Sequence, residues 1–306
     1  MGSLRASGTI SETARAMSNV SSAGARPDSD GKGSNRWSSW LSSSLGDLAL
    51  GAIGPAAFVL IWWLAVALGL FPRAVLPSPS DVGAALFDWA FGDRANGPYS
   101  GTLLDAVMAS GYRVLVGYAI AAVLGILIGI PTGFFRVLGK IVEPLITLFR
   151  PIPITAWVPL SLVFFGFGFK SALFLVALGS FFPIVVNTIE GVRGASRTLV
   201  RVGRMLGANQ IELLWHFILP ASLPSIFVGL RLGMGLAWVL VIVAELLSVK
   251  SGIGYTLLDA YSFNRYDVII AAMITLGVMG FLSDRIIVAI QRVMLRWHLE
   301  MSIHAD

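Results

Sequence analysis

Residues 195–220 read ASRTLVRVGRMLGANQIELLWHFILP, and this stretch carries basic residues although it lies between two long apolar segments. Leu199, Val202 and Leu206 follow one another at helical spacing. This pattern predicts an amphipathic helix with an apolar stripe and a basic face. Gly207 comes next and predicts a helix end, since glycine adopts a positive φ without steric cost.

A second short helix is predicted after this glycine. Its apolar side would hold Ile211, Leu214, Trp215 and Ile218, and Pro220 would end it. The arginines of the stretch exclude it from hydrocarbon, where a charged side chain is costly. The sequence therefore predicts a helix, a glycine elbow and a second helix at the inner surface of a membrane. An interfacial helix that lies on lipid is the alternative interpretation of the same pattern.

The composition of the whole chain indicates a polytopic membrane protein. Apolar residues make up 56% of its 306 residues, charged residues 13%, and the mean hydropathy is +0.80. The net charge is +5, but the basic residues are interleaved with apolar spans, which argues against a nucleic-acid partner. The chain has no cysteine, so disulfides and thiolate metal sites are excluded.

Six membrane spans are predicted from the apolar runs. They cover about 48–71, 113–135, 144–166, 171–189, 221–247 and 268–291. Basic residues concentrate in the loops that this count places inside, which predicts that both termini are cytoplasmic. Residues 1–45 are predicted to be a disordered cytoplasmic tail, residues 46–300 the transmembrane domain, and residues 301–306 a cytoplasmic tail. Residues 80–112 are expected to form an amphipathic helix and loop on the outside.

Small residues recur at every fourth position of the second predicted span. They are Gly117, Ala121, Gly125, Gly129 and Gly133. Small residues in register let another helix approach closely in lipid, where van der Waals contact drives association, so this stripe predicts a packing seam.

The third predicted span contains four prolines and is expected to be kinked or broken. They are Pro144, Pro151, Pro153 and Pro159. Backbone groups freed at membrane depth are tolerated only against protein or a watery cavity. Arg150 lies in the same region, either lining a translocation path or bracing it.

Glu245 in the fifth span has two open interpretations. It either shapes the path or its outer gate, or it is an ion partner of Arg231, Arg150 or a neighbouring subunit. Three aromatic side chains are candidates for path lining or for packing. They are Phe181, Phe182 and Trp238.

The chain lacks the motifs of the enzyme classes considered. GFGFKS at 166–171 lacks the glycine that a nucleotide-binding loop needs before its lysine. No G-x-S-x-G motif occurs, and His216, His298 and His304 have no metal-ligand spacing. The chain is therefore predicted to be no enzyme and to hold neither a metal nor a cofactor.

The stretch 195–220 resembles the cytoplasmic coupling loop of permeases of binding-protein-dependent ABC importers. Gly207 and the pair Leu219–Pro220 match the family motif, whereas its E-A-A triplet is replaced by Arg201, Val202 and Gly203. Further segments resemble the nitrate, sulfonate, taurine and bicarbonate branch. They are LPSPSDV (76–82), FRPIPITAWVPLSLVFFGFG (149–168), FFPIVVNTIEGV (181–192), GLRLGMGLAWVLVIVAELL (229–247) and SGIGYTLLDAY (251–261).

This resemblance implies an all-α, type I importer permease of the bacterial inner membrane. It implies a path for a small anion or sulfonate-like solute, a second permease copy in a homodimer, a periplasmic or lipid-anchored solute-binding protein, and separate ATPase subunits that hold ATP and Mg²⁺. The residues expected to couple to the ATPase are Leu199, Val202, Met205, Leu206, Gly207, Ala208, Ile211, Leu214, Leu219 and Pro220. The rival class is an ion-coupled secondary transporter, which would predict inverted repeats and several mid-membrane charges.

Overall fold

A computed structural model describes residues 53–72 and 75–295. The predicted tails, 1–45 and 301–306, lie outside these ranges. The chain divides into two compact units, Met1–Leu60 and Ile61–Asp306. The described part of the first unit is the start of an apolar helix, Ile53–Ala67.

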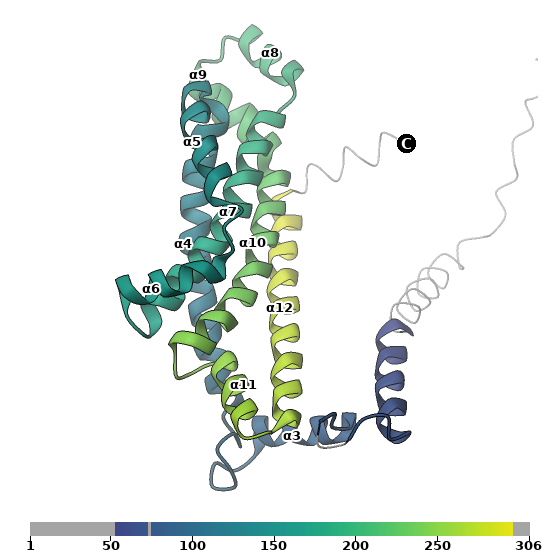
Figure 1. The fold of residues 1–306 in the computed structure, drawn as a ribbon. Helices are drawn as coiled ribbons and strands as arrows, with labels where there is room; N and C mark the ends of the chain where they lie inside the picture. The colour runs from purple at the N-terminus through teal and green to yellow at the C-terminus, as the bar shows by residue number, and fades with distance from the viewer. Residues whose placement is uncertain (1–52, 73–74, 296–306) are drawn as a thin grey trace, which may run out of the picture. The chain divides into compact units, whose positions relative to one another are not determined.

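The described residues of the larger unit form helices joined by short connections, with no strand among them (Figure 1). The helices are α3 (Pro79–Phe91), α4 (Leu103–Phe134), α5 (Arg136–Phe149), η1 (Ile154–Trp157), α6 (Val158–Phe165), α7 (Phe169–Gly194), α8 (Arg197–Met205), α9 (Gln210–Leu213), η2 (Leu214–Ile218), α10 (Leu219–Ser248), α11 (Ile253–Ser262) and α12 (Tyr266–Met294). Helices α8 and α9 lie at one end of the bundle, and α3 and α11 lie at the other.

Four helices in the described residues are long and apolar enough to cross a membrane. They are α4, α7, the continuous helix Gln210–Ser248 and α12. Arg136–Phe149 and Ile154–Phe165 together pass the same test but are bent by 90°, so the predicted broken span is confirmed. Ile53–Ala67 is shorter than the ~20 residues that a membrane span needs. The count of six spans thus stays a prediction.

The second predicted span begins earlier than the sequence indicates. Helix α4 starts at Leu103, so residues 103–112, which end the stretch predicted as an amphipathic outer helix and loop, are continuous with the helix of the second span. Ser110 and Arg113 break the apolar run in the sequence, and for this reason the predicted span began at 113. In the structure both side chains are buried against a carboxylate on α10 and face the interior of the bundle.

The predicted packing seam on α4 is confirmed, and its partner is α7. A Cβ atom at Gly117, Gly125, Gly129 or Gly133 would come within 2.6–2.8 Å of a side chain of α7. Ala121, in the same stripe, is buried. The two backbones therefore approach so closely that glycine is required at these positions.

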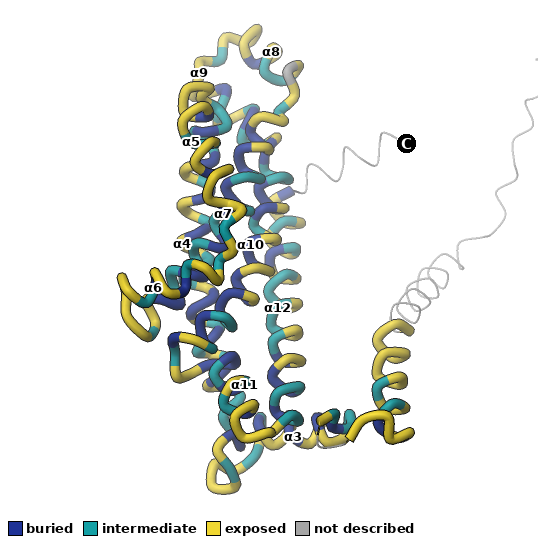
Figure 2. Tube along the Cα trace, in the orientation of Figure 1, coloured by how far each residue is buried: buried dark blue, intermediate teal, exposed yellow. Residues whose placement is uncertain are grey.

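Helix α10 packs against α7 through a second set of small residues. A Cβ atom at Gly229 would lie 2.8 Å from Cβ of Asn187, and one at Gly233 would lie 2.9 Å from the Ile184 side chain. Helix α7 therefore lies between α4 and α10 and is mostly buried along its inner turns (Figure 2). The three helices form the rigid centre of the larger unit.

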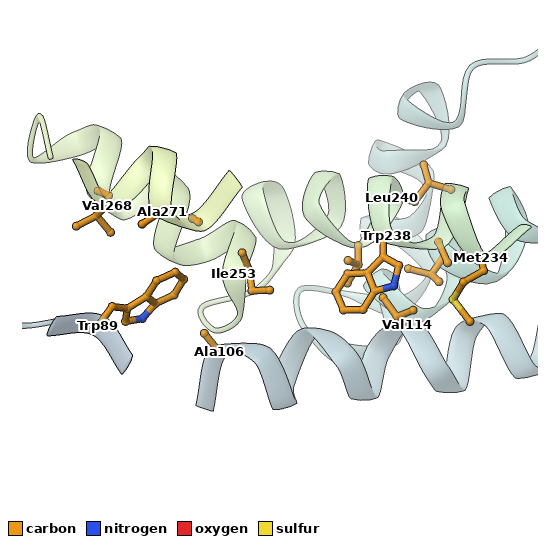
Figure 3. Packing of buried hydrophobic residues seen from close by; sticks show 14 of the residues in the cluster. Trp89, Ala106, Val114, Met234, Trp238, Leu240, Ile253, Val268 and Ala271 are labelled. Carbon is orange, nitrogen blue, oxygen red and sulfur yellow. The ribbon is translucent and has the colours of Figure 1, made fainter. Parts of the chain in front are cut away.

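The end of the bundle that carries α3 packs into the main hydrophobic core, which continues between α4, α7 and α10. Ser78 and Asp81 form a capping box at the start of α3. Trp89 on α3 is buried beside Val268 and Ala271 of α12 (Figure 3). In the following loop the hydroxyl of Tyr99 donates to the carboxylate of Asp259 on α11. Burial and this bond raise the pKa of Tyr99.

Candidate functional site

The stretch 195–220 forms two helices joined by the predicted glycine elbow. Gly207 has φ of +82°, which confirms the expected positive φ. The amide of Gly207 donates to the carbonyl of Arg204, and that of Ala208 donates to the carbonyl of Gly203. These two bonds form a Schellman motif, which satisfies the last carbonyls of α8. Asn209 and Glu212 then form a capping box that starts α9.

The inward side of this loop is anchored on a small hydrophobic cluster. Leu213 and Ile218 are buried together with Val192 at the end of α7, and Val200 and Phe217 pack against them. The sequence indicated one apolar face for Ile211, Leu214, Trp215 and Ile218, but the structure divides it. Leu214 and Ile218 contribute to the anchor, whereas Ile211 and Trp215 face outward.

The outward side presents a row of exposed apolar side chains. Met205 is 85% exposed, Leu206 74%, Ile211 71% and Trp215 60%, and Val202 is exposed as well. We call these five residues the coupling ridge. Arg201 and Arg204 are exposed on the same helix as Met205. The loop thus exposes more large apolar side chains than a water-facing loop needs, which marks a surface for docking.

The remaining expected coupling residues are less exposed. Leu199, Ala208, Leu214, Leu219 and Pro220 are all half-buried. Pro220 does not end the second helix, because Gln210–Ser248 is continuous. A π-helical turn at Leu214–Ile218 runs directly into α10, so Pro220, the second residue of α10, lies inside one continuous helix.

Two of the aromatic path candidates lie inside the protein. Trp238 is buried, lies close to Val114 and Met234 (Figure 3), and donates from Nε1 to Oγ of Ser283 at 3.0 Å. It therefore packs between helices within this chain. Phe182 is buried too, whereas its neighbour Phe181 is half-buried and lines an apolar pocket on the side of the bundle.

Glu245 is fully buried and has partners that the sequence analysis did not identify. Its carboxylate accepts from Nη1 of Arg113 at 2.7 Å, from Oγ of Ser110 and from the amide of Gly254 at 2.8 Å. The expectation of Arg231 or Arg150 as its partner was wrong, since Arg231 pairs with Asp284 instead. A buried carboxylate is tolerated when it is paired and hydrogen-bonded, as it is at this position.

These contacts join three helices at the end of the bundle that carries α11. Arg113 also donates to the carbonyl of Ser251, and Oγ of Ser110 accepts from the amide of Ile253. Gly252 has φ of +108°, which lets the backbone turn around the carboxylate. Glu245 therefore fixes the start of α11 to α4 and α10, and we call this group the Glu245 lock.

Arg150 lies at the bend of the broken span. Its side chain is exposed and lines a cleft of about 540 Å³ between the end of α5 and α7. The cleft shares Glu143, Thr147 and Arg193 with a wider groove of about 1270 Å³ that extends to Arg136 at the start of α5. The two adjoin along α5 and carry charged side chains in a mixed lining, and together we call them the elbow cleft.

Among the described residues, no group of His, Asp and Glu side chains is placed to hold a metal ion. The described residues form an exposed ridge at one end, the elbow cleft on the flank and a buried lock at the other end, which are features suited to binding and movement.

Comparison with protein families gives one match that covers most of the bundle. The family described as "binding-protein-dependent transport system inner membrane component" matches residues 121–296. A putative ABC transporter permease of Methanocaldococcus jannaschii is 41% identical over 76% of this chain and 85% of its own length.

Two further relatives are similar over nearly their whole length. A putative aliphatic sulfonates transport permease of Escherichia coli is 37% identical over 80% of this chain and 90% of its own. A bicarbonate transport system permease of Synechococcus elongatus is 36% identical over 89% and 96%. A solved structure of the methionine transporter MetNI in an inward-facing conformation has the same fold, with a TM-score of 0.57, 17% identity, and coverage of 64% of this chain and 98% of its own.

Proposed function

This chain belongs to the inner-membrane components of binding-protein-dependent transport systems, and from this premise we propose that it forms the path for a small anionic or sulfonate-bearing solute. It is a multi-pass inner-membrane protein and the permease subunit of an ABC importer. It is not an enzyme, since ATP hydrolysis occurs in a separate subunit. Family membership also excludes the alternative of an ion-coupled secondary transporter.

The coupling ridge is the proposed contact for that ATPase, and it is the observation that carries the mechanism. Met205, Leu206 and Ile211 face outward from a loop whose inner side is anchored to α4 and α7. Force applied to the ridge would thus pass directly into two membrane helices. ATP with Mg²⁺ would bind the partner, and its closure would shift the bundle between inward- and outward-facing states.

Met205→Glu tests this assignment. Burial of a methionine side chain contributes about 1.5–3 kcal/mol, and a charge at the same contact loses that contribution, so we expect the ATPase to bind at least ~10-fold more weakly. Gln210→Glu is the matched control, because it adds the same charge at a helix start, where an acid is favoured. Co-purification of the ATPase and quantitative binding provide the measurement. Equal binding by both variants would refute the ridge as the docking surface.

A second copy of the chain is the proposed partner within the membrane. The elbow cleft supports this, because it carries charged side chains on the flank of a membrane domain. Polar groups at that level must be covered by protein or face water rather than lipid. A homodimer would enclose the two clefts, and a solute-binding protein would deliver the solute at the end that carries α3 and α11.

The relatives suggest the class of cargo. The named solutes are aliphatic sulfonates for one relative and bicarbonate for another. Both bear a compact oxyanion, which is the feature that we transfer to this chain. The test measures uptake of ethanesulfonate and of bicarbonate by cells that express the whole importer. If the cells take up neither solute, the proposal is contradicted.

A further inference from the structure

Arg150 lies within a predicted membrane span, at the bend that follows α5. Helix α5 has 14 residues before Arg150, a length of about 21 Å measured from the end that carries α8. On the facing helix the cleft is lined by Val186, eight residues before the end of α7 at Gly194, or roughly 12 Å along the axis. The hydrocarbon core of a bilayer is about 30 Å thick. The predicted span begins at residue 144, so Arg150 lies six residues, or about 9 Å, inside it, in the half of the core nearer the end that carries α8.

Arg150 forms no ion pair within the described part of this chain. The other cation that lines the same cleft, Arg193, is paired with Glu143, with Nη1 2.7 Å from Oε2. Among the described residues no carboxylate forms an ion pair with Arg150. An exposed and unpaired arginine at membrane depth must face water or a group of opposite charge.

We propose that Arg150 is an anion-binding residue of the translocation path, which takes an oxyanion of the carboxylate or sulfonate type. The inference rests on the proposed function and names the group that meets its cargo. A guanidinium presents a planar fork of donors that matches two oxygens of such an anion. Glu190 lines the same cleft, one turn nearer the end that carries α8, and its carboxylate opposes tight retention of the anion. Binding that is favourable but weak suits a path that must also release its solute.

The chain has no cysteine, so a single introduced thiol can report on the cleft. Thr147→Cys places it one turn before Arg150, in a residue that lines both parts of the elbow cleft. The variant is assembled with its ATPase in lipid nanodiscs. Labelling rates are measured with the anionic 2-sulfonatoethyl methanethiosulfonate and with its cationic trimethylammonium counterpart, and the ratio of the two rates is the readout.

Arg150→Gln in this background is expected to lower the ratio of anionic to cationic labelling by about tenfold. A unit charge at about 5–6 Å changes the local concentration of each reagent by roughly three- to fourfold in water, and in opposite directions. Arg150→Lys retains the charge and should preserve the ratio. Lys140→Gln removes an equal charge from the wider groove, about a Debye length from the thiol at position 147. The labelling ratio should therefore change by less than about twofold.

Three outcomes would overturn the proposal. The ratio could be unchanged by Arg150→Gln, or the thiol could react with neither reagent in the assembled complex, which would mean that water does not reach the cleft. Arg150→Gln could also separate the two permease copies in size-exclusion chromatography, which would identify a brace between subunits. A different result would contradict the proposed function itself. In that case the ATPase would not co-purify with this chain, or cells expressing the whole importer would take up no solute.

Discussion

Gly129→Ala tests whether the α4–α7 seam is as tight as the structure indicates. The added Cβ would lie 2.6 Å from Cβ of Thr188, which is 0.8 Å short of the 3.4 Å at which ordinary contact begins. It would also lie 3.1 Å from the carbonyl oxygen of Val185. Neither neighbour is the end of a flexible side chain, so the two helices must separate. Forcing an extra carbon into a packed interior costs about 1–3 kcal/mol.

Gly111→Ala is the matched control on the same helix. An added Cβ at Gly111 meets nothing within 4 Å. Both substitutions gain the same helix propensity, worth up to about 1 kcal/mol in water. The difference between the two variants therefore isolates the cost of overpacking, and this difference is expected to remain about 1–3 kcal/mol.

Thermal unfolding of the purified protein measures this difference. Each kcal/mol corresponds to roughly 2–4 °C for a domain of this size, so Gly129→Ala should unfold some 2–12 °C below Gly111→Ala. Both are scanned at one rate in the same detergent, because unfolding of membrane proteins can be irreversible. Equal unfolding temperatures would refute the close approach of α4 and α7.

Five other variants test the Glu245 lock, the glycine elbow and the N-terminal tail. Glu245→Gln and Arg113→Gln should each lower the free energy of unfolding by about 3–5 kcal/mol, because each leaves a buried charge unpaired. The double variant should lose less stability than the sum of the two single losses. Additive losses would show that the two side chains are not coupled. Gly207→Val should lower importer-driven uptake while the protein remains in the membrane, since a β-branched residue is strained at φ of +82°, and normal uptake would show that the elbow is not needed. Deletion of residues 1–40 should leave uptake unchanged, as expected of a disordered tail, and loss of assembly measured by co-purification would contradict this.

Much of the fold could be predicted because it depends on local patterns. The spacing of Gly117, Gly125, Gly129 and Gly133 identified a seam, since only small side chains permit close helix contact in lipid. Gly207 identified the elbow because positive φ is a property of one residue and its neighbours. The prolines around Arg150 indicated a broken span for the same reason, because they remove local hydrogen bonds.

The candidate site was less predictable where it depends on contacts between distant residues. The coupling loop was recognised, but the sequence placed Ile218 and Trp215 on one face, whereas packing buries one and exposes the other. The sequence singled out Arg150, yet its position in the elbow cleft depends on α7 lying beside α5.

By itself the sequence determined the helical membrane class, the elbow and the seam, because hydropathy, glycine spacing and proline placement act within one or two turns of the chain. Only the tertiary structure decided the role of Glu245. Its partner Arg113 is 132 residues away in the sequence and was assigned to a span end. Two charges that would each be costly in hydrocarbon become compatible with it only when folding brings them within 2.7 Å and buries them together.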